Sequence, residues 1–68
     1  MSDPTKDLQS LRTSLHDMNN RVGVILATAE MLQLQQLDTK ALERARLIEQ
    51  KSLELRGILR SIGERFFP

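Results

Sequence analysis

The sequence predicts an all-α protein, an antiparallel helical hairpin that forms a homodimeric four-helix bundle. Two stretches, residues 4–35 and 39–66, each carry apolar residues at alternating spacings of three and four, which is typical of packed helices. A short connection at residues 36–38 separates them, and short connections join antiparallel neighbours. At 68 residues, the whole chain (1–68) is predicted to be a single domain.

The first predicted helix, residues 4–35, begins after Asp3, because an aspartate can cap free amide groups and Pro4 suits the first helical turn. Gly23 is its weak point, at a cost of about 1 kcal/mol relative to alanine. Its apolar stripe, which has the spacing of the a/d seam of packed helices, is Leu8, Leu11, Leu15, Met18, Val22, Ile25, Ala29 and Leu32.

The second predicted helix, residues 39–66, has Asp38 or Thr39 as its cap and Glu43 in its first turns, where negative charge suits the helix dipole. Its expected apolar stripe is Ala41, Ala45, Ile48, Ser52, Leu55, Leu59, Ile62 and Phe66. Its expected charged outer face is Glu43, Arg46, Glu49, Lys51, Glu54, Arg56, Arg60 and Glu64.

A second copy of the chain is predicted from its small size. A domain of about 60 residues buries only about 60% of the surface that its unfolded chain exposes, so it needs a disulfide, a metal or a partner chain. With no cysteine and one histidine, the partner chain remains. Each helix also carries apolar residues off its stripe, which one hairpin cannot cover: Val24, Leu26, Met31, Leu34, Leu42, Leu47, Leu53 and Ile58.

Composition argues against several classes of partner. The net charge is +1 with mixed signs, and the only aromatic residues are Phe66 and Phe67, so no nucleic acid binding is expected. No apolar run approaches the roughly 18 residues of a membrane span, and the polar N-terminus lacks the apolar core of a signal peptide. We therefore expect no membrane contact by this segment and a cytoplasmic location.

The only histidine, His16, lies one position beyond the apolar stripe, so it should be partly exposed on a rigid helix. A neutral imidazole is a good nucleophile near neutral pH, and the adjacent Asp17 can orient the ring or take its proton. Asn20 lies about one turn later on the same side, where its amide can both donate and accept hydrogen bonds. The small side chains of Gly23 and Ala27 come next along this side, and leave a shallow groove for a partner's helix.

Residues 15–20, Leu-His-Asp-Met-Asn-Asn, resemble the H-box of the dimerisation and histidine-phosphotransfer domain (DHp, HisKA-like) of sensor histidine kinases. In that family a histidine is followed by Glu or Asp, two variable residues, and Asn or Thr. The run at 24–32 is also similar to the segment after the box in that family. The resemblance implies that His16 is the phosphoacceptor, that Asp17 assists it, and that Asn20 positions water for dephosphorylation of a partner's aspartyl phosphate.

The resemblance also implies partners. These are a kinase ATP-binding domain and a response-regulator receiver domain, which would contact Asn19, Gly23 and Ala27 beside the histidine. No cofactor or metal is expected in this chain, since ATP and magnesium would belong to those partner domains. Many family members have proline where this chain has Arg21, so the helix should be straighter here, and Arg21 can pair with Asp17.

The sequence leaves several alternatives open. The chain is either a fragment of a histidine kinase or a stand-alone phosphotransfer protein, since nothing in it resembles the ATP-binding boxes. It could instead be a non-catalytic dimerisation or docking module with an incidental histidine. Asn19 could be solvated surface, and Gly23 could serve close helix approach inside the bundle. A monomeric phosphotransfer bundle needs about four helices, and this chain offers two.

Overall fold

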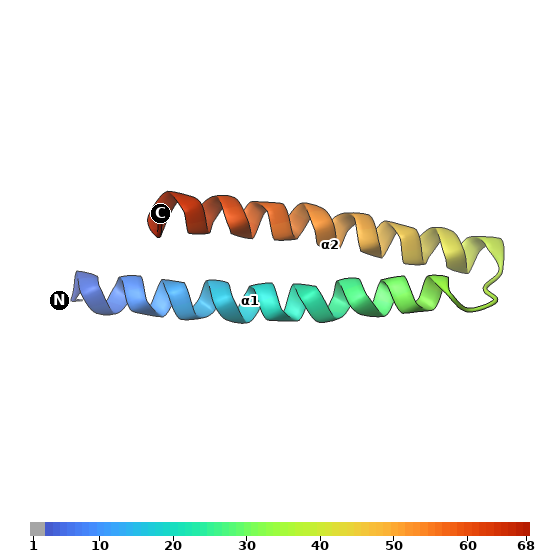
Figure 1. Cartoon of the computed structure of the whole chain (residues 1–68), viewed down its shortest axis with the longest axis horizontal. Coiled ribbons are helices and arrows are strands. Elements are labelled where there is room, and N and C mark those ends of the chain that lie inside the picture. The colour runs from blue at the N-terminus through green and yellow to red at the C-terminus, as the bar shows by residue number, and fades with distance from the viewer. Residues whose placement is uncertain (1–2) are drawn as a thin grey trace.

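The computed structural model describes residues 3–68 as two helices, α1 (Pro4–Gln33) and α2 (Thr39–Phe66). They lie side by side and antiparallel, with both termini at one end and the connection at the other (Figure 1). The hairpin measures 54 × 18 × 16 Å. The predicted all-helical hairpin is therefore confirmed.

Both predicted helix starts are capped by aspartate. Asp3 accepts a hydrogen bond through Oδ1 from the backbone N–H of Thr5 at 2.9 Å. Of the two candidates before the second helix, Asp38 is the cap and accepts from the backbone N–H of Ala41 at 2.8 Å. These bonds satisfy amide groups that have no partner within their helix.

The first helix ends at Gln33, two residues before the predicted end. The N–H of Leu34 turns back to the carbonyl of Met31 at 3.1 Å, and residues 34–38 form the connection. At this end, Nε2 of Gln33 donates to Oε2 of Glu49 at 3.2 Å and joins the two helices. Glu49 is half-buried as a result, so its predicted place on the outer face is wrong.

Within the hairpin only part of each predicted stripe packs against the other helix. The buried positions recur every seven residues: Leu15, Val22 and Ala29 on α1, and Ala45, Ser52 and Leu59 on α2. The stripe positions three residues after most of these are exposed instead: Met18, Ile25, Ile48 and Leu55. Leu8 and Phe66, toward the end of the hairpin that carries both termini, are exposed as well. A single hairpin therefore leaves these six stripe residues uncovered.

Leu26 shows where α2 lies relative to the predicted stripe. It lies off that stripe, yet it is 7% exposed, whereas Ile25 is 48% exposed. At about 100° per residue, Leu26 lies about 40° from Val22 around the helix, and Ile25 lies about 60° away in the opposite sense. The second helix therefore packs on the Leu26 side of the stripe and leaves the Ile25 side open.

The buried core is thin. Leu15, Val22 and Leu59 form its centre, and three half-buried apolar residues pack against them: Leu11, Ile62 and Phe67. No large side chain in residues 3–68 is fully buried. The buried hydroxyl of Ser52 donates to the carbonyl of Ile48 at 2.7 Å, so this small residue fills the crossing without an unsatisfied polar group.

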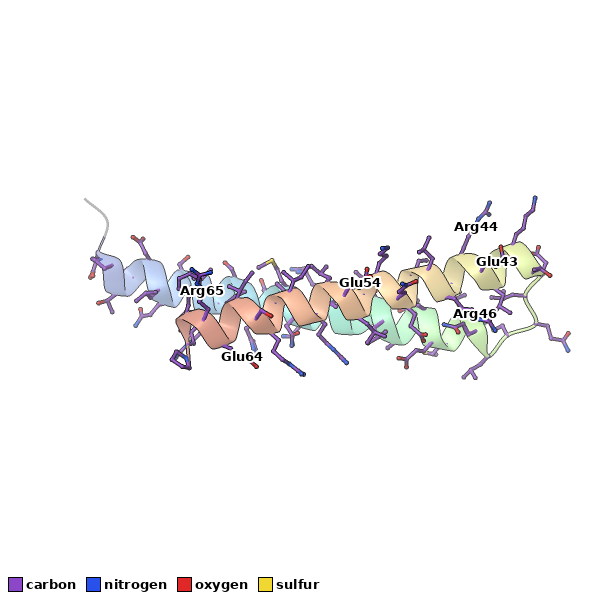
Figure 2. All side chains as sticks on the ribbon, turned by 90° about the horizontal axis from the view of Figure 1, so that it is seen from above. Glu43, Arg44, Arg46, Glu54, Glu64 and Arg65 are labelled. Atoms are coloured by element: carbon purple, nitrogen blue, oxygen red, sulfur yellow. The ribbon has the colours of Figure 1, made fainter. Side chains whose placement is uncertain are left out.

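Surface charges are mostly separate from one another. Among residues 3–68 the one ion pair joins Lys51 to Glu54 at 3.1 Å, and the pair expected for Asp17 and Arg21 is not formed. Exposed pairs contribute only about 0.3–0.5 kcal/mol on a helix, too little to hold two long side chains in one geometry. Figure 2 shows the side chain of Arg44 projecting away from both helices.

Candidate functional site

The candidate site is built on the middle of α1, where the helix runs without interruption from Pro4 to Gln33. No proline directly follows Asn20, so no kink of that origin occurs near the histidine. His16 is exposed, as its position beside the stripe predicts, while its neighbour Leu15 is buried. Burial of Leu15 holds this turn against α2 and so fixes where the imidazole projects.

His16 lies at a groove between the two helices, which we call the arginine groove. Four residues of α1 line it, namely Arg12, Leu15, His16 and Asn19, and α2 contributes Arg56, Leu59 and Arg60. Leu15 and Leu59 also belong to the buried core, so they form its apolar floor. The groove therefore places an imidazole, a carboxamide and three guanidinium groups around an apolar floor.

The contribution of α2 to the arginine groove was not predicted. Arg56 and Arg60 are exposed, as expected, but they line the groove that contains His16 instead of an outer face remote from α1. One signal in the sequence could have found them. Arg60 directly follows Leu59 on its stripe, and Arg56 lies three residues before it, so both flank a residue that packs on α1.

The other predicted site residues lie outside the arginine groove. Asn20 and Ala27 are exposed and Gly23 is half-buried, and all three share the side of α1 that carries His16. A Cβ built on Gly23 would meet no neighbouring atom within 4 Å, so close approach of α2 does not require a glycine there. Asp17 is exposed and lies about 100° around the helix from His16.

A second groove, which we call the apolar groove, has a different character. Five of its seven lining residues belong to the two stripes, and only one of the seven is charged: Val22, Ile25, Leu47, Ile48, Lys51, Ser52 and Leu55. Ile25, Ile48 and Leu55 are exposed members of the predicted stripes. The two helices thus present their unpacked apolar positions together on one side.

Within residues 3–68 no group of three or more His, Cys, Asp or Glu side chains could hold a metal ion. In the same part of the chain, neither helix is long and apolar enough to cross a membrane.

The chain matches no model of a known protein family, no curated protein and no solved structure. Its function is therefore inferred from the arginine groove, from the exposed apolar face and from the resemblance of residues 15–20 to the H-box.

Proposed function

We propose that this chain is a dimerisation and phosphoacceptor domain of two-component signalling, in which His16 carries a phosphoryl group to or from a response-regulator aspartate. The observation that supports it best is the placement of His16, exposed on an uninterrupted helix beside a groove that arginines line and to which no carboxylate of residues 3–68 contributes. A phosphoacceptor needs this combination, because its ring must reach a partner's phosphorus while the negative charge is compensated.

The proposed chemistry is a pair of in-line displacements. A ring nitrogen of neutral His16 attacks the donor phosphorus, the bond from phosphorus to the leaving oxygen breaks, and the ring proton passes to Asp17 or to water. In the second step the receiver's aspartate carboxylate attacks that phosphorus, the N–P bond breaks, and the leaving imidazole takes up a proton from water. ATP and magnesium belong to the partner domains, which act in the cytoplasm in this proposal.

The face beyond His16 suits contact with a receiver. Asn20 and Ala27 are exposed there and Gly23 carries no side chain, so a partner helix could lie close along α1. In this proposal Asn20 positions a water molecule that dephosphorylates the receiver's aspartyl phosphate. Asn19 lines the arginine groove and so lies on the side of His16 nearer to α2.

The homodimer is the second part of the proposal, and the unpacked heptad positions support it. Ile25, Ile48 and Leu55 are 48%, 43% and 44% exposed and line the apolar groove together. The pairing of α1 with α2 leaves these stripe positions exposed, so a further neighbour is needed to bury them. A second hairpin that packs on this face would complete a four-helix bundle.

Surface area supports the same conclusion. A compact monomer of 7.8 kDa is expected to expose about 4,400 Å², whereas the hairpin exposes 5757 Å². The excess exceeds the roughly 800 Å² that each partner buries in an interface of standard size. The hairpin therefore has more surface to cover than a self-sufficient domain of its mass.

The test of the phosphoacceptor role uses the single histidine. The purified chain is incubated with receiver domains from the same genome that have been phosphorylated by acetyl phosphate, and its mass is followed. We expect a gain of one phosphoryl group that is lost in acid and stable in alkali. Because His16 is the only histidine, this acid-labile group reports on one residue, and His16→Gln should abolish it without changing the oligomeric state.

The alternative function, a docking module with an incidental histidine, is favoured by one observation. Val24, Met31 and Leu34 are 67%, 66% and 87% exposed and line neither the arginine groove nor the apolar groove. Neither the dimer nor phosphotransfer explains why these apolar residues are exposed, and they could bind another partner protein. An intact dimer that never acquires an acid-labile phosphoryl group would favour this alternative.

A further inference from the structure

The three arginines of the arginine groove form a regular arrangement. Arg12 and His16 are one turn apart on α1, and Arg56 and Arg60 are one turn apart on α2. All four line the same groove, on either side of Leu15 and Leu59. Two helices thus bring three fixed positive charges to one short stretch of the hairpin.

No negative charge from residues 3–68 occupies that groove. Its lining includes no carboxylate, and the one ion pair in this part of the chain involves Lys51 and Glu54 instead. Asp17, the nearest acid in sequence to His16, is not part of the lining. An anion from outside the chain that entered the groove would therefore meet three guanidinium groups and no carboxylate.

Arg12 is held in place by an aromatic ring. Its guanidinium carbon lies 4.9 Å from the centroid of the Phe67 ring, and Phe67 packs against the buried core. A guanidinium that stacks on a ring keeps its N–H donors at its edge available for an anion. Because this contact already restricts the Arg12 side chain, Arg12 loses less conformational entropy when it binds an anion.

We propose that Arg12, Arg56 and Arg60 form a binding site for a phosphate-class dianion beside the ring of His16. That the dianion is the phosphoryl group in transfer rests on the proposed function, whereas binding of free phosphate does not. Guanidinium groups match the oxygens of a phosphate and bind them in bidentate fashion. The carboxamide of Asn19 adds a donor, and the apolar floor of the groove strengthens each charge–charge attraction.

The first experiment measures binding of inorganic phosphate to the full chain at constant pH. The single histidine gives one set of ring signals in a ¹H–¹³C NMR spectrum, which should move in a saturable manner with phosphate. In Arg56→Gln/Arg60→Gln the affinity should fall about tenfold. The matched control is Arg44→Gln/Arg46→Gln, which changes the net charge equally on α2 but lies outside the groove, and there the affinity should change less than about twofold.

The second experiment tests whether the bound anion lies where His16 can be phosphorylated. Phosphoramidate is an anionic donor: its P–N bond breaks, a bond forms from phosphorus to a ring nitrogen of His16, and ammonia leaves with the ring proton. We expect Arg56→Gln/Arg60→Gln to slow this reaction about tenfold and Arg44→Gln/Arg46→Gln to leave it within about twofold. Helicity measured by circular dichroism verifies that each variant folds.

The outcomes separate this inference from the proposed function. Phosphate should still bind to His16→Gln, followed by calorimetry, because the arginines remain. If phosphate binds through the arginines but no receiver ever phosphorylates His16, the anion site stands and the signalling role fails. If receivers phosphorylate His16 while both arginine pairs behave alike, or if no saturable binding occurs, the anion site is refuted.

Discussion

His16 and Ile25 lie on opposite sides of α1. They are nine positions apart, and at about 100° per residue this separation corresponds to half a turn more than two full turns. The arginine groove that contains His16 and the apolar groove that contains Ile25 consequently open on opposite faces of the hairpin. A second hairpin could therefore cover the apolar face while the imidazole stays accessible.

This separation predicts that Ile25→Glu disrupts the dimer. A carboxylate placed in the apolar groove would have to lose its water when the second hairpin packs there, and the one charged residue of that groove, Lys51, already pairs with Glu54. Sedimentation should show a species of twice 7.8 kDa for the natural chain and of 7.8 kDa for the variant. The control is Val24→Glu, because Val24 is more exposed, at 67%, yet lies outside the groove and should leave the dimer intact. If Ile25→Glu and Val24→Glu affected the dimer equally, the apolar groove would not be the dimer interface.

The cap of α2 gives a prediction about stability. Oδ1 of Asp38 accepts the N–H of Ala41, so Asp38→Ala should lower the free energy of unfolding by about 1 kcal/mol. Asparagine caps helices about as well as aspartate, so Asp38→Asn should retain most of that stability. Urea denaturation followed by circular dichroism measures both. If Asp38→Asn lowered the free energy of unfolding as much as Asp38→Ala, the charge of Asp38 and not its hydrogen bond would matter at this position.

The fold could be predicted from the sequence because the features that determine it are local. Helix caps such as Asp3 and Asp38 act within three residues, and a repeat of three and four marks which side of each helix is apolar. The exposed position of His16 results from the same repeat. These features do not depend on how the two helices are rotated against each other.

The arginine groove could not be predicted from the sequence, because it depends on how the two helices are rotated against each other. The stripe is wide enough for α2 to pack on the side of Leu26 or on the side of Ile25, and only the structure shows that α2 packs on the Leu26 side. This packing brings Arg56 and Arg60 around to the side of His16. The end of α1 at Gln33 was missed for another reason: no glycine or proline marks it, so the signals that usually indicate a helix end are absent.

Gly23 offers a prediction that separates its two possible roles. Because a Cβ there would meet nothing within 4 Å in the hairpin, Gly23→Ala should raise the free energy of unfolding by about 0.5–1 kcal/mol through helix propensity alone. Gly57→Ala, equally unobstructed, is the control and should give a similar gain. If Gly23 serves partner access, its variant should also transfer phosphoryl groups to a receiver more slowly. A loss of stability would instead indicate close helix approach inside the dimer.

The two adjacent asparagines provide the sharpest test of the proposed reaction, since they lie about 100° apart around α1. Asn20 lies on the exposed face with His16, so Asn20→Ala should slow receiver dephosphorylation at least about tenfold, by removing the amide that holds the water. Phosphoryl uptake by His16 should change less than about twofold.

Asn19 lines the arginine groove, so Asn19→Ala should have the reverse pattern, with slower uptake and unchanged dephosphorylation. Both rates are followed with a phosphorylated receiver, by the mass of each protein over time. Identical profiles for the two variants would mean that the groove and the outer face of α1 do not act in separate steps, and the division of roles between Asn19 and Asn20 would have to be abandoned.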